Sequence, residues 1–208
     1  MTRTTARLVR LAGGLMAGTI ILTGCSDTSE GSGAEGSSSG AGGSANDAGV
    51  GNDADVAFVQ GMIPHHRGAI VMAQLADGRA QDPRVQDLAD RIEAAQGPEI
   101  QTLTGWLEEW DEPLPDEDMG GMDHGSGGMD MEGMSEEDMA ALDSAFGADF
   151  DRLFLDLMVD HHRGAVDMAE TEIAEGSHAD AVDMARGIVE SQTAEIQEME
   201  TLLTELGG

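Results

Sequence analysis

Residues 58–73, FVQGMIPHHRGAIVMA, return ninety-six positions later as residues 154–169, FLDLMVDHHRGAVDMA. Both copies keep Met, His-His, Arg-Gly-Ala and Met at identical spacing. The register continues downstream, where Ile92, Gln96, Glu99, Ile100 and Gln101 match Ile188, Gln192, Glu195, Ile196 and Gln197. Residues 58–110 and 154–206 are therefore two copies of one unit, too short for a solenoid array, which can pack into one domain.

The N-terminus has the pattern of a lipoprotein export signal. Three arginines precede an apolar run over residues 11–22, and the sequence Leu-Thr-Gly-Cys then ends at Cys25, the only cysteine of the chain. The run is too short to span a bilayer as a helix, which favours a signal peptide over residues 1–24. We expect lipidation of Cys25 and attachment to the outer face of the cell membrane. The folded part would then hold no thiol, which excludes disulfides and thiolate metal sites.

The next segment is mostly Gly, Ser, Ala and Asp without apolar periodicity, which is typical of a flexible tether. We assign residues 25–53 to this tether and residues 54–208 to one domain. The chain has no lysine, and its net charge of −31 becomes −34 when the three arginines of the signal are removed. Such an acidic surface repels nucleic acid, so no nucleic-acid partner is expected.

Apolar periodicity predicts an all-α domain, an up-down bundle of four long helices in two duplicated hairpins. The predicted helices begin near Asn52, Asp82, Ala148 and His178, and end near Asp77, Trp110, Glu175 and Leu206. Pro64 and Gly97-Pro98 should bend the first two helices. Residues 113–134 form a Gly-rich and Asp-rich connection, after which Ser135 opens a short helix with a capping-box pattern.

The histidines and methionines of each copy share one helix face with apolar residues. At about 100° per residue, this face holds Met62, His65, His66 and Met72 in the first copy and Met158, His161, His162 and Met168 in the second. The imidazoles should therefore face the core, where they need partners. A single buried histidine is most often a hydrogen-bonded structural residue, but two His-His pairs flanked by Met favour a metal site. Thioether and imidazole together suit Cu(I).

A Gln and a Glu interrupt the apolar stripe of the helix that follows each motif. They are Gln96 and Glu99 in the first copy and Gln192 and Glu195 in the second. A carboxylate on a core face is costly without a partner, and the available partners are the His pairs and Arg67 or Arg163. The two Glu should accept an imidazole N–H or ligate a metal; a simple strut between helices is the alternative. Gly68 and Gly164, in mid-helix, indicate close helix approach beside the site.

The connection between the two halves is rich in thioethers. It places Met119, Met122, His124, Met129, Met131 and Met134 within sixteen residues of Gly-rich sequence. Because there is no core for them to fill, clustered methionines favour a chelating segment for Cu(I) or Ag(I). The alternatives are a linker with incidental methionines and a sacrificial trap for oxidants.

The doubled M-x-x-HH-x-G-A-x-x-MA motif, followed in each half by Q-x-x-EI, closely resembles the bacterial secreted domain-of-unknown-function 305 family over nearly all of residues 54–208. The resemblance implies a ferritin-like four-helix bundle in an exported protein, in a family in which some members look like periplasmic copper-binding proteins. Carried over by motif, it implies eight metal ligands: Met62, His65, His66, Met72, Met158, His161, His162 and Met168.

These features favour a surface-anchored lipoprotein that binds Cu(I) or a similar soft ion for sequestration or transfer, without turnover and without an organic cofactor. A ferritin-like metalloenzyme is a second hypothesis, but the Glu-x-x-His motifs of such bundles are reduced here to one string, Glu175–His178, at an inter-helix turn. A third hypothesis is a structural or interaction domain whose histidines form buried hydrogen-bond networks. The sequence identifies no protein partner.

Overall fold

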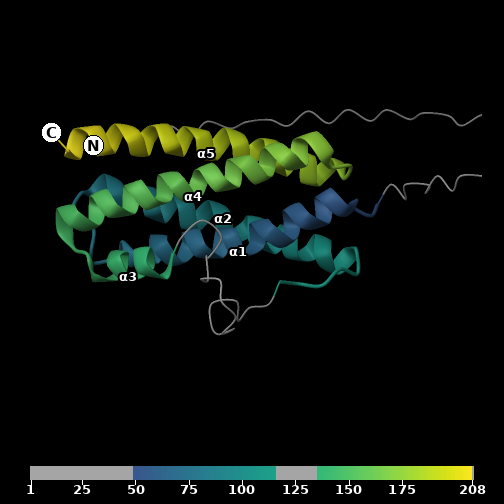
Figure 1. Ribbon diagram of the computed structural model, residues 1–208, viewed down its shortest axis with the longest axis horizontal. Coiled ribbons are helices and arrows are strands. Elements are labelled where there is room, and N and C mark those ends of the chain that lie inside the picture. The colour runs from purple at the N-terminus through teal and green to yellow at the C-terminus, as the bar shows by residue number, and fades with distance from the viewer. Residues whose placement is uncertain (1–48, 116–134, 208) are drawn as a thin grey trace, which may run out of the picture. The chain divides into compact units, whose positions relative to one another are not determined.

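The computed structural model describes residues 49–115 and 135–207, and in these ranges the chain forms five helices and no strand. The helices are α1 (Asp53–Leu75), α2 (Pro83–Glu109), α3 (Glu136–Ser144), α4 (Gly147–Glu175) and α5 (Ala179–Leu206). The four long ones form two antiparallel hairpins, α1–α2 and α4–α5, which confirms the predicted all-α bundle (Figure 1). The predicted signal peptide, Cys25 and the tether up to residue 48 lie outside the described residues.

Most helices begin at a residue whose side chain caps the first turn. Asn52 and Asp55 form a capping box at the start of α1, in which each side chain accepts a hydrogen bond from the backbone N–H of the other. Asp82 caps α2, Ser135 caps α3 through a second capping box, and His178 caps α5. These four starts agree with the predicted ones.

The two hairpins meet chiefly through α1 and α4, which run antiparallel (Figure 1). Pro64 and Pro98 lie inside α1 and α2, and neither ends its helix. Gly78 follows α1 with a φ of 73°, a conformation that reverses the chain and that glycine adopts without a Cβ clash. The prediction that the first helix ends at this glycine turn is therefore confirmed.

Two apolar clusters fill the interior. The first gathers the end of α1 and the start of α2 around Phe150 and Phe154 of α4. The second gathers the start of α1 and the end of α2 with Ala165 and Ala169 of α4, and it includes Trp110. Because each cluster contains residues of both repeats, the two copies share one core and fold as one domain.

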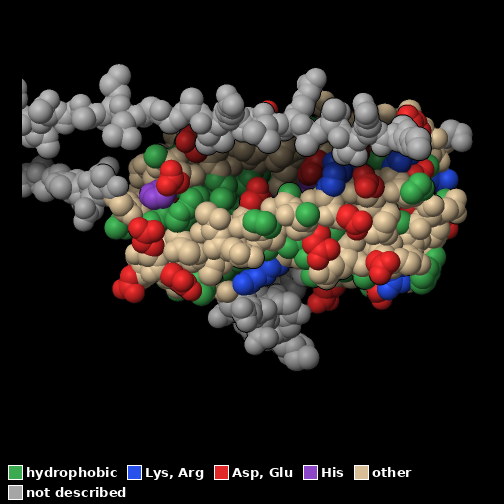
Figure 2. Space-filling model, turned by 180° about the vertical axis from the view of Figure 1, so that it is seen from behind, with side chains coloured by type: hydrophobic (Ala, Val, Ile, Leu, Met, Phe, Trp, Pro, Cys, Tyr) green, Lys and Arg blue, Asp and Glu red, His purple; other side chains and the backbone are tan. Residues whose placement is uncertain are grey.

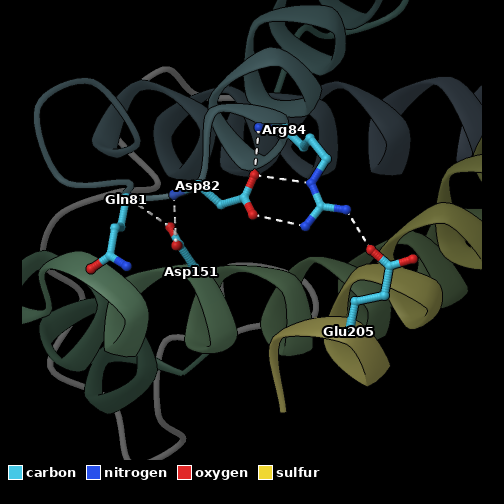
Figure 3. A network of polar contacts seen from close by, with 5 residues as sticks. All are labelled: Gln81, Asp82, Arg84, Asp151 and Glu205. Carbon is cyan, nitrogen blue, oxygen red and sulfur yellow. Dashed lines mark hydrogen bonds and ion pairs between the residues drawn. The ribbon is translucent and has the colours of Figure 1, made fainter. Parts of the chain in front are cut away.

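Two buried aspartates tie each repeat to the inter-helix turn of the other. Asp151 of α4 accepts hydrogen bonds of 2.9 Å from the backbone N–H groups of residues 81–82, in the turn between α1 and α2 (Figure 3). Asp55 of α1 accepts hydrogen bonds of 2.9–3.2 Å from the backbone N–H groups of residues 177–178, in the turn between α4 and α5. The ninety-six-residue repeat register relates one contact to the other. We refer to them as the Asp151 clasp and the Asp55 clasp.

Acidic side chains are spread over the face shown in Figure 2, with few basic ones among them. Arg84 forms ion pairs with Asp82 and Glu205 (Figure 3), and Arg91 pairs with Glu198 at 2.7 Å, so that both arginines join α2 to α5. These exposed pairs each contribute little to stability. Within residues 49–115 and 135–207, no helix is long and apolar enough to cross a membrane.

Candidate metal centre

The four histidines of the repeat motifs lie in the interior of the bundle. His65 and His66 belong to α1, His161 and His162 belong to α4, and none is more than 3 % exposed. Because the hairpins meet through these two helices, the two motifs face each other across the interface. The prediction that the imidazoles face the core is confirmed.

The second histidine of each motif is bound to a carboxylate of the following long helix. Nε2 of His66 lies 2.7 Å from Oε2 of Glu99, and Nε2 of His162 lies 2.8 Å from Oε2 of Glu195. An ionised carboxylate only accepts hydrogen bonds, so Nε2 of each imidazole donates to the carboxylate opposite it. The predicted pairing of these two carboxylates with the motif imidazoles is confirmed.

The first histidines of the two motifs pair with each other. The ring centroids of His65 and His161 lie 3.7 Å apart, with the ring planes inclined by 43°. Glycine allows this approach: a Cβ on Gly68 would lie 3.2 Å from Nε2 of His161, and a Cβ on Gly164 would lie 3.2 Å from Nε2 of His65. The predicted close approach at both glycines is confirmed, and the contact joins each glycine to the histidine of the other repeat.

Several buried polar atoms at this centre have no hydrogen-bond partner. Among the described residues, they are Nδ1 of His66, His161 and His162. Unpartnered buried polar atoms are uncommon because each costs on the order of 1–3 kcal/mol, so a cluster of them marks a candidate ligand site. Imidazole nitrogens beside thioethers are a donor set that fits a soft metal ion.

The two imidazoles that meet between the repeats, His65 and His161, are uncharged at neutral pH, and we refer to them as the inner pair. Burial lowers the pKa of His65 to about 3 and that of His161 to about 2, and the neighbouring imidazoles add to the effect. Both rings therefore keep a nitrogen lone pair free of protons well into the acidic range. A metal ion would not have to displace a proton from either ring.

The motif methionines flank the histidines in the core. Met62, Met72 and Met158 are fully buried, and Met168 is partly buried. Met62 and Met168 belong to the second apolar cluster, whereas Met72 and Met158 belong to the first. Within residues 49–115 and 135–207, no three side chains of His, Cys, Asp or Glu are arranged to hold a metal ion.

The remaining predicted residues are not part of this centre. Met119, Met122, His124, Met129, Met131 and Met134 lie outside the described residues. Arg163, a predicted partner of the core-face carboxylates, lies on the exposed face of α4 and pairs with Asp160 and Glu200 at 2.9 Å. The Glu-x-x-His string Glu175–His178 lies at the turn between α4 and α5, as predicted.

Sequence reasoning missed a second group of buried polar residues, at the α4–α5 turn. Asp55 is fully buried, Glu172 is 1 % exposed, and the carboxyl of Glu172 lies against Gly176, next to the turn residues that Asp55 binds. The ring of His178 packs at 5.1 Å, centroid to centroid, against Trp110. One signal for this group was available, because Asp55 and Asp151 occupy the same position of the two repeats.

The chain matches a known protein family over most of its length. The match to the family described as a domain of unknown function, DUF305, covers residues 55–203. Among curated proteins, the chain is 40 % identical over 55 residues to the uncharacterized protein L153 of Acanthamoeba polyphaga mimivirus, which is 26 % of this chain and 36 % of the relative. The chain thus spans about a third of the length of that relative.

Solved structures share the fold. A DUF305 protein from Streptomyces coelicolor is 33 % identical with a TM-score of 0.64, over 74 % of this chain and 93 % of that chain. CopM in its Cu(II)-bound form is 34 % identical with a TM-score of 0.62, over 73 % of this chain and 96 % of that chain. CopM in its Cu(I)-bound form is 30 % identical with a TM-score of 0.60, over 74 % and 98 %. The match over residues 55–203, together with these structures, shows that the chain belongs to the DUF305 family.

Proposed function

We propose that this protein is an exported, lipid-anchored binder of Cu(I), or of a similar soft ion such as Ag(I), which sequesters the ion or hands it on. One observation carries the proposal: four buried imidazoles of the two repeats gather where α1 packs on α4, and three of them keep an Nδ1 without a hydrogen-bond partner among the described residues. The similarity to CopM, which has been solved in Cu(II)-bound, Cu(I)-bound and Ag-bound forms, supports a metal-binding role.

His65 and His161 would hold the ion, since both rings are neutral and belong to different repeats. His66 and His162 would offer Nδ1, because Nε2 of each ring donates a hydrogen bond to the carboxylate behind it. A carboxylate in this position fixes the orientation of a ligating imidazole and makes it a better donor. The buried thioethers of the motifs complete the donor set.

The character of the centre favours a soft monovalent ion over a hard divalent one. All four imidazoles are almost fully buried, and the nearby carboxylates are engaged with Nε2 of His66 and His162. A doubly charged ion is costly to desolvate in such surroundings, whereas thioether and imidazole ligands suit Cu(I) and Ag(I). Calcium, which prefers oxygen ligands, should therefore compete poorly at this centre, and zinc and calcium should both compete poorly at the thioethers of residues 119–134.

Two parts of the proposal rest on sequence alone. Residues 119–134 would form a second, weaker soft-metal site, since clustered methionines in Gly-rich sequence have no core to fill. Cys25 would anchor the protein to the outer face of the membrane after cleavage of residues 1–24. The similar DUF305 protein from Streptomyces coelicolor is described as a secreted protein, which supports export of this one.

Anaerobic Cu(I) titration against a competing chelator tests the bundle site. A His65→Ala, His161→Ala double variant should lose the tighter site and the metal-dependent rise in melting temperature. His178→Asn is the matched control, because it removes a histidine outside the motifs and Asn retains the capping role at the start of α5. Equal Cu(I) affinity in all three proteins would contradict the proposal and leave the histidines as a structural network.

Two further variants test the parts inferred from sequence. Deletion of residues 119–134 should lower the Cu(I) stoichiometry and leave the tighter site and the helical content unchanged. Cys25→Ala should release the protein from the membrane fraction, and continued sedimentation with membranes would contradict the anchor.

A further inference from the structure

The turn between α4 and α5 is held to the start of α1 by a dense set of hydrogen bonds. Asp55 accepts bonds from the N–H of Ser177 at 3.1 Å, the hydroxyl of Ser177 at 3.0 Å and the N–H of His178 at 2.9 Å. Asn52 adds a bond from its side-chain amide to the carbonyl of Glu175 at 2.9 Å. These bonds attach the turn between α4 and α5 to the N-terminal end of α1.

A second carboxyl group, that of Glu172, lies against this clasp. Glu172 is 1 % exposed, and neither of its carboxyl oxygens receives a hydrogen bond from an N–H or O–H group of the described residues. Its carboxyl lies beside the same turn, since a Cβ on Gly176, the residue before Ser177, would clash with it. Two buried carboxyl groups at one turn repel each other unless one of them carries a proton.

The surroundings determine which group carries that proton. Burial opposes ionisation of Asp55, but Glu172 and hydrogen bonds from the backbone of His178, Asn52 and Ser177 together hold its pKa below the ordinary value. Burial and the neighbouring Asp55 raise the pKa of Glu172 to about 8. The proton therefore resides on Glu172, beside an ionised Asp55.

Few other charged groups are available to compensate a second negative charge here. Asp53 and Asp55 come from α1, Glu175 from α4, and His178 and Asp180 from the start of α5. From α2, the rings of Trp106 and Trp110 pack against His178, and they carry no charge. Apart from His178, all of these titratable groups are acids.

The Asp151 clasp provides a built-in comparison. The repeat register places Ala76, which is fully buried, at the position that corresponds to Glu172. Asp151 still accepts two backbone hydrogen bonds of 2.9 Å, but the equivalent position offers no second carboxyl group. The two clasps thus share their backbone contacts to the turn, whereas a second buried carboxyl group accompanies only Asp55.

We propose that the Asp55–Glu172 carboxyl pair is a proton-held latch, which fastens the α4–α5 turn to the start of α1 and loosens when the proton leaves. Loss of the proton places two negative charges at one buried turn, and opening of the turn relieves the repulsion by admitting water. The latch requires no metal ion, so its test on the metal-free protein does not depend on whether the protein binds copper.

The direction of the pH effect follows from linkage. The folded pKa of Glu172 is raised above its ordinary value of 4.5, so the closed turn binds the proton more tightly than the open turn does. The stabilisation is complete below the ordinary value, decreases as pH rises, and is lost once pH passes about 8. Between pH 6 and pH 8, the opening equilibrium should rise by up to about tenfold per pH unit, and it should level off above that range.

Amide hydrogen exchange on the metal-free protein tests the latch. After correction for intrinsic exchange rates, residues 177–178 should lose protection between pH 6 and pH 8, whereas residues 81–82 of the Asp151 clasp should not. Glu172→Gln is the matched variant, because an amide does not ionise in this pH range. Protection of residues 177–178 in this variant should be independent of pH.

Three results would overturn the latch. The first is equal pH dependence at the two clasps of the wild-type protein, a comparison that remains valid even if Glu172→Gln does not fold. The second is a folded Glu172→Gln variant that retains the pH dependence. The third is a change in protection of residues 177–178 on addition of calcium or EDTA, because a cation would then hold the two carboxylates together.

Discussion

The rings of His65 and His161, one from each repeat, lie 3.7 Å apart where α1 packs on α4. Neither repeat can form this pair alone, so the duplication builds one shared centre and not two separate ones. The outer imidazoles, His66 and His162, each remain tied to a carboxylate of their own repeat. The centre therefore combines a contact between repeats with two contacts within repeats.

Substitution of the motif glycines tests how closely the two helices must approach. A Cβ on Gly68 or Gly164 would meet an imidazole nitrogen of the other repeat at 3.2 Å, whereas a Cβ on Gly187 would meet nothing within 4 Å. Gly187→Ala should raise the free energy of unfolding by about 0.5–1 kcal/mol, the usual helix gain. Gly68→Ala and Gly164→Ala should raise the free energy of unfolding by less than this, because His161 or His65 must shift to make room for the new methyl group. Urea titration measures the difference. The same increase in the free energy of unfolding at all three positions would show that a Cβ at Gly68 or Gly164 does not force His65 or His161 to move.

The carboxylates behind the outer imidazoles should matter for metal affinity more than for folding. Glu195→Gln keeps the shape of the side chain but removes the charge that orients His162, and loss of such a partner typically costs about 10–100-fold in metal affinity. Glu190→Gln, on the exposed side of α5, is the control and should leave affinity unchanged. Competition titration with Cu(I) gives the answer; identical affinities in both variants would remove Glu195 from the proposed centre.

The sequence predicted those parts of the structure that depend on local pattern. The caps at Asn52 and Asp82, the burial of the motif histidines and the approach of Glu99 to His66 follow from helical periodicity and from the cost of burying a lone charge. The pairing of His65 with its counterpart does not follow, because it depends on how the two hairpins cross. Periodicity assigns a residue to a face but does not determine which residue lies opposite.

The two clasps were missed for a related reason. Asp55 lies in the first turn of α1, where an acidic residue is ordinary, and its capping-box contact to Asn52 accounts for it locally. Its bonds to residues 177–178 cross more than 120 positions of sequence. The repeat register could have exposed the pattern, since Asp151 recurs at the same place, but Glu172 replaces Ala76 and has no counterpart to compare.

The Asp151 clasp should contribute measurably to stability. Asp151→Asn leaves one of the two backbone N–H groups of residues 81–82 without an acceptor, and an unpaired buried donor costs about 1–3 kcal/mol. Asp156→Asn, an exposed position on the same helix, is the matched control and should change the free energy of unfolding by less than about 0.5 kcal/mol. Equal midpoints in urea for the two variants would mean that the turn finds other partners.

Acid should destabilise the metal-free protein through the inner histidines. The pKa values of His65 and His161 in the folded state, about 3 and about 2, lie well below the ordinary value of 6.5. Below pH 6.5 the unfolded chain therefore binds protons that the folded chain does not, so stability is complete above pH 6.5 and falls as pH decreases. The slope should reach up to about 1.4 kcal/mol per pH unit for each histidine.

Urea unfolding at pH 7, 6 and 5 measures this slope in the presence of a chelator. A His65→Gln, His161→Gln double variant should lose less stability on acidification than the wild-type protein, whereas His178→Asn should behave like the wild type. Carboxylates that titrate near pH 5 are common to all three proteins, so they cancel in the comparison. If the double variant and the wild type show the same acid slope, His65 and His161 take up protons in the folded state as they do in the unfolded chain. The inner pair is then not held uncharged in solution.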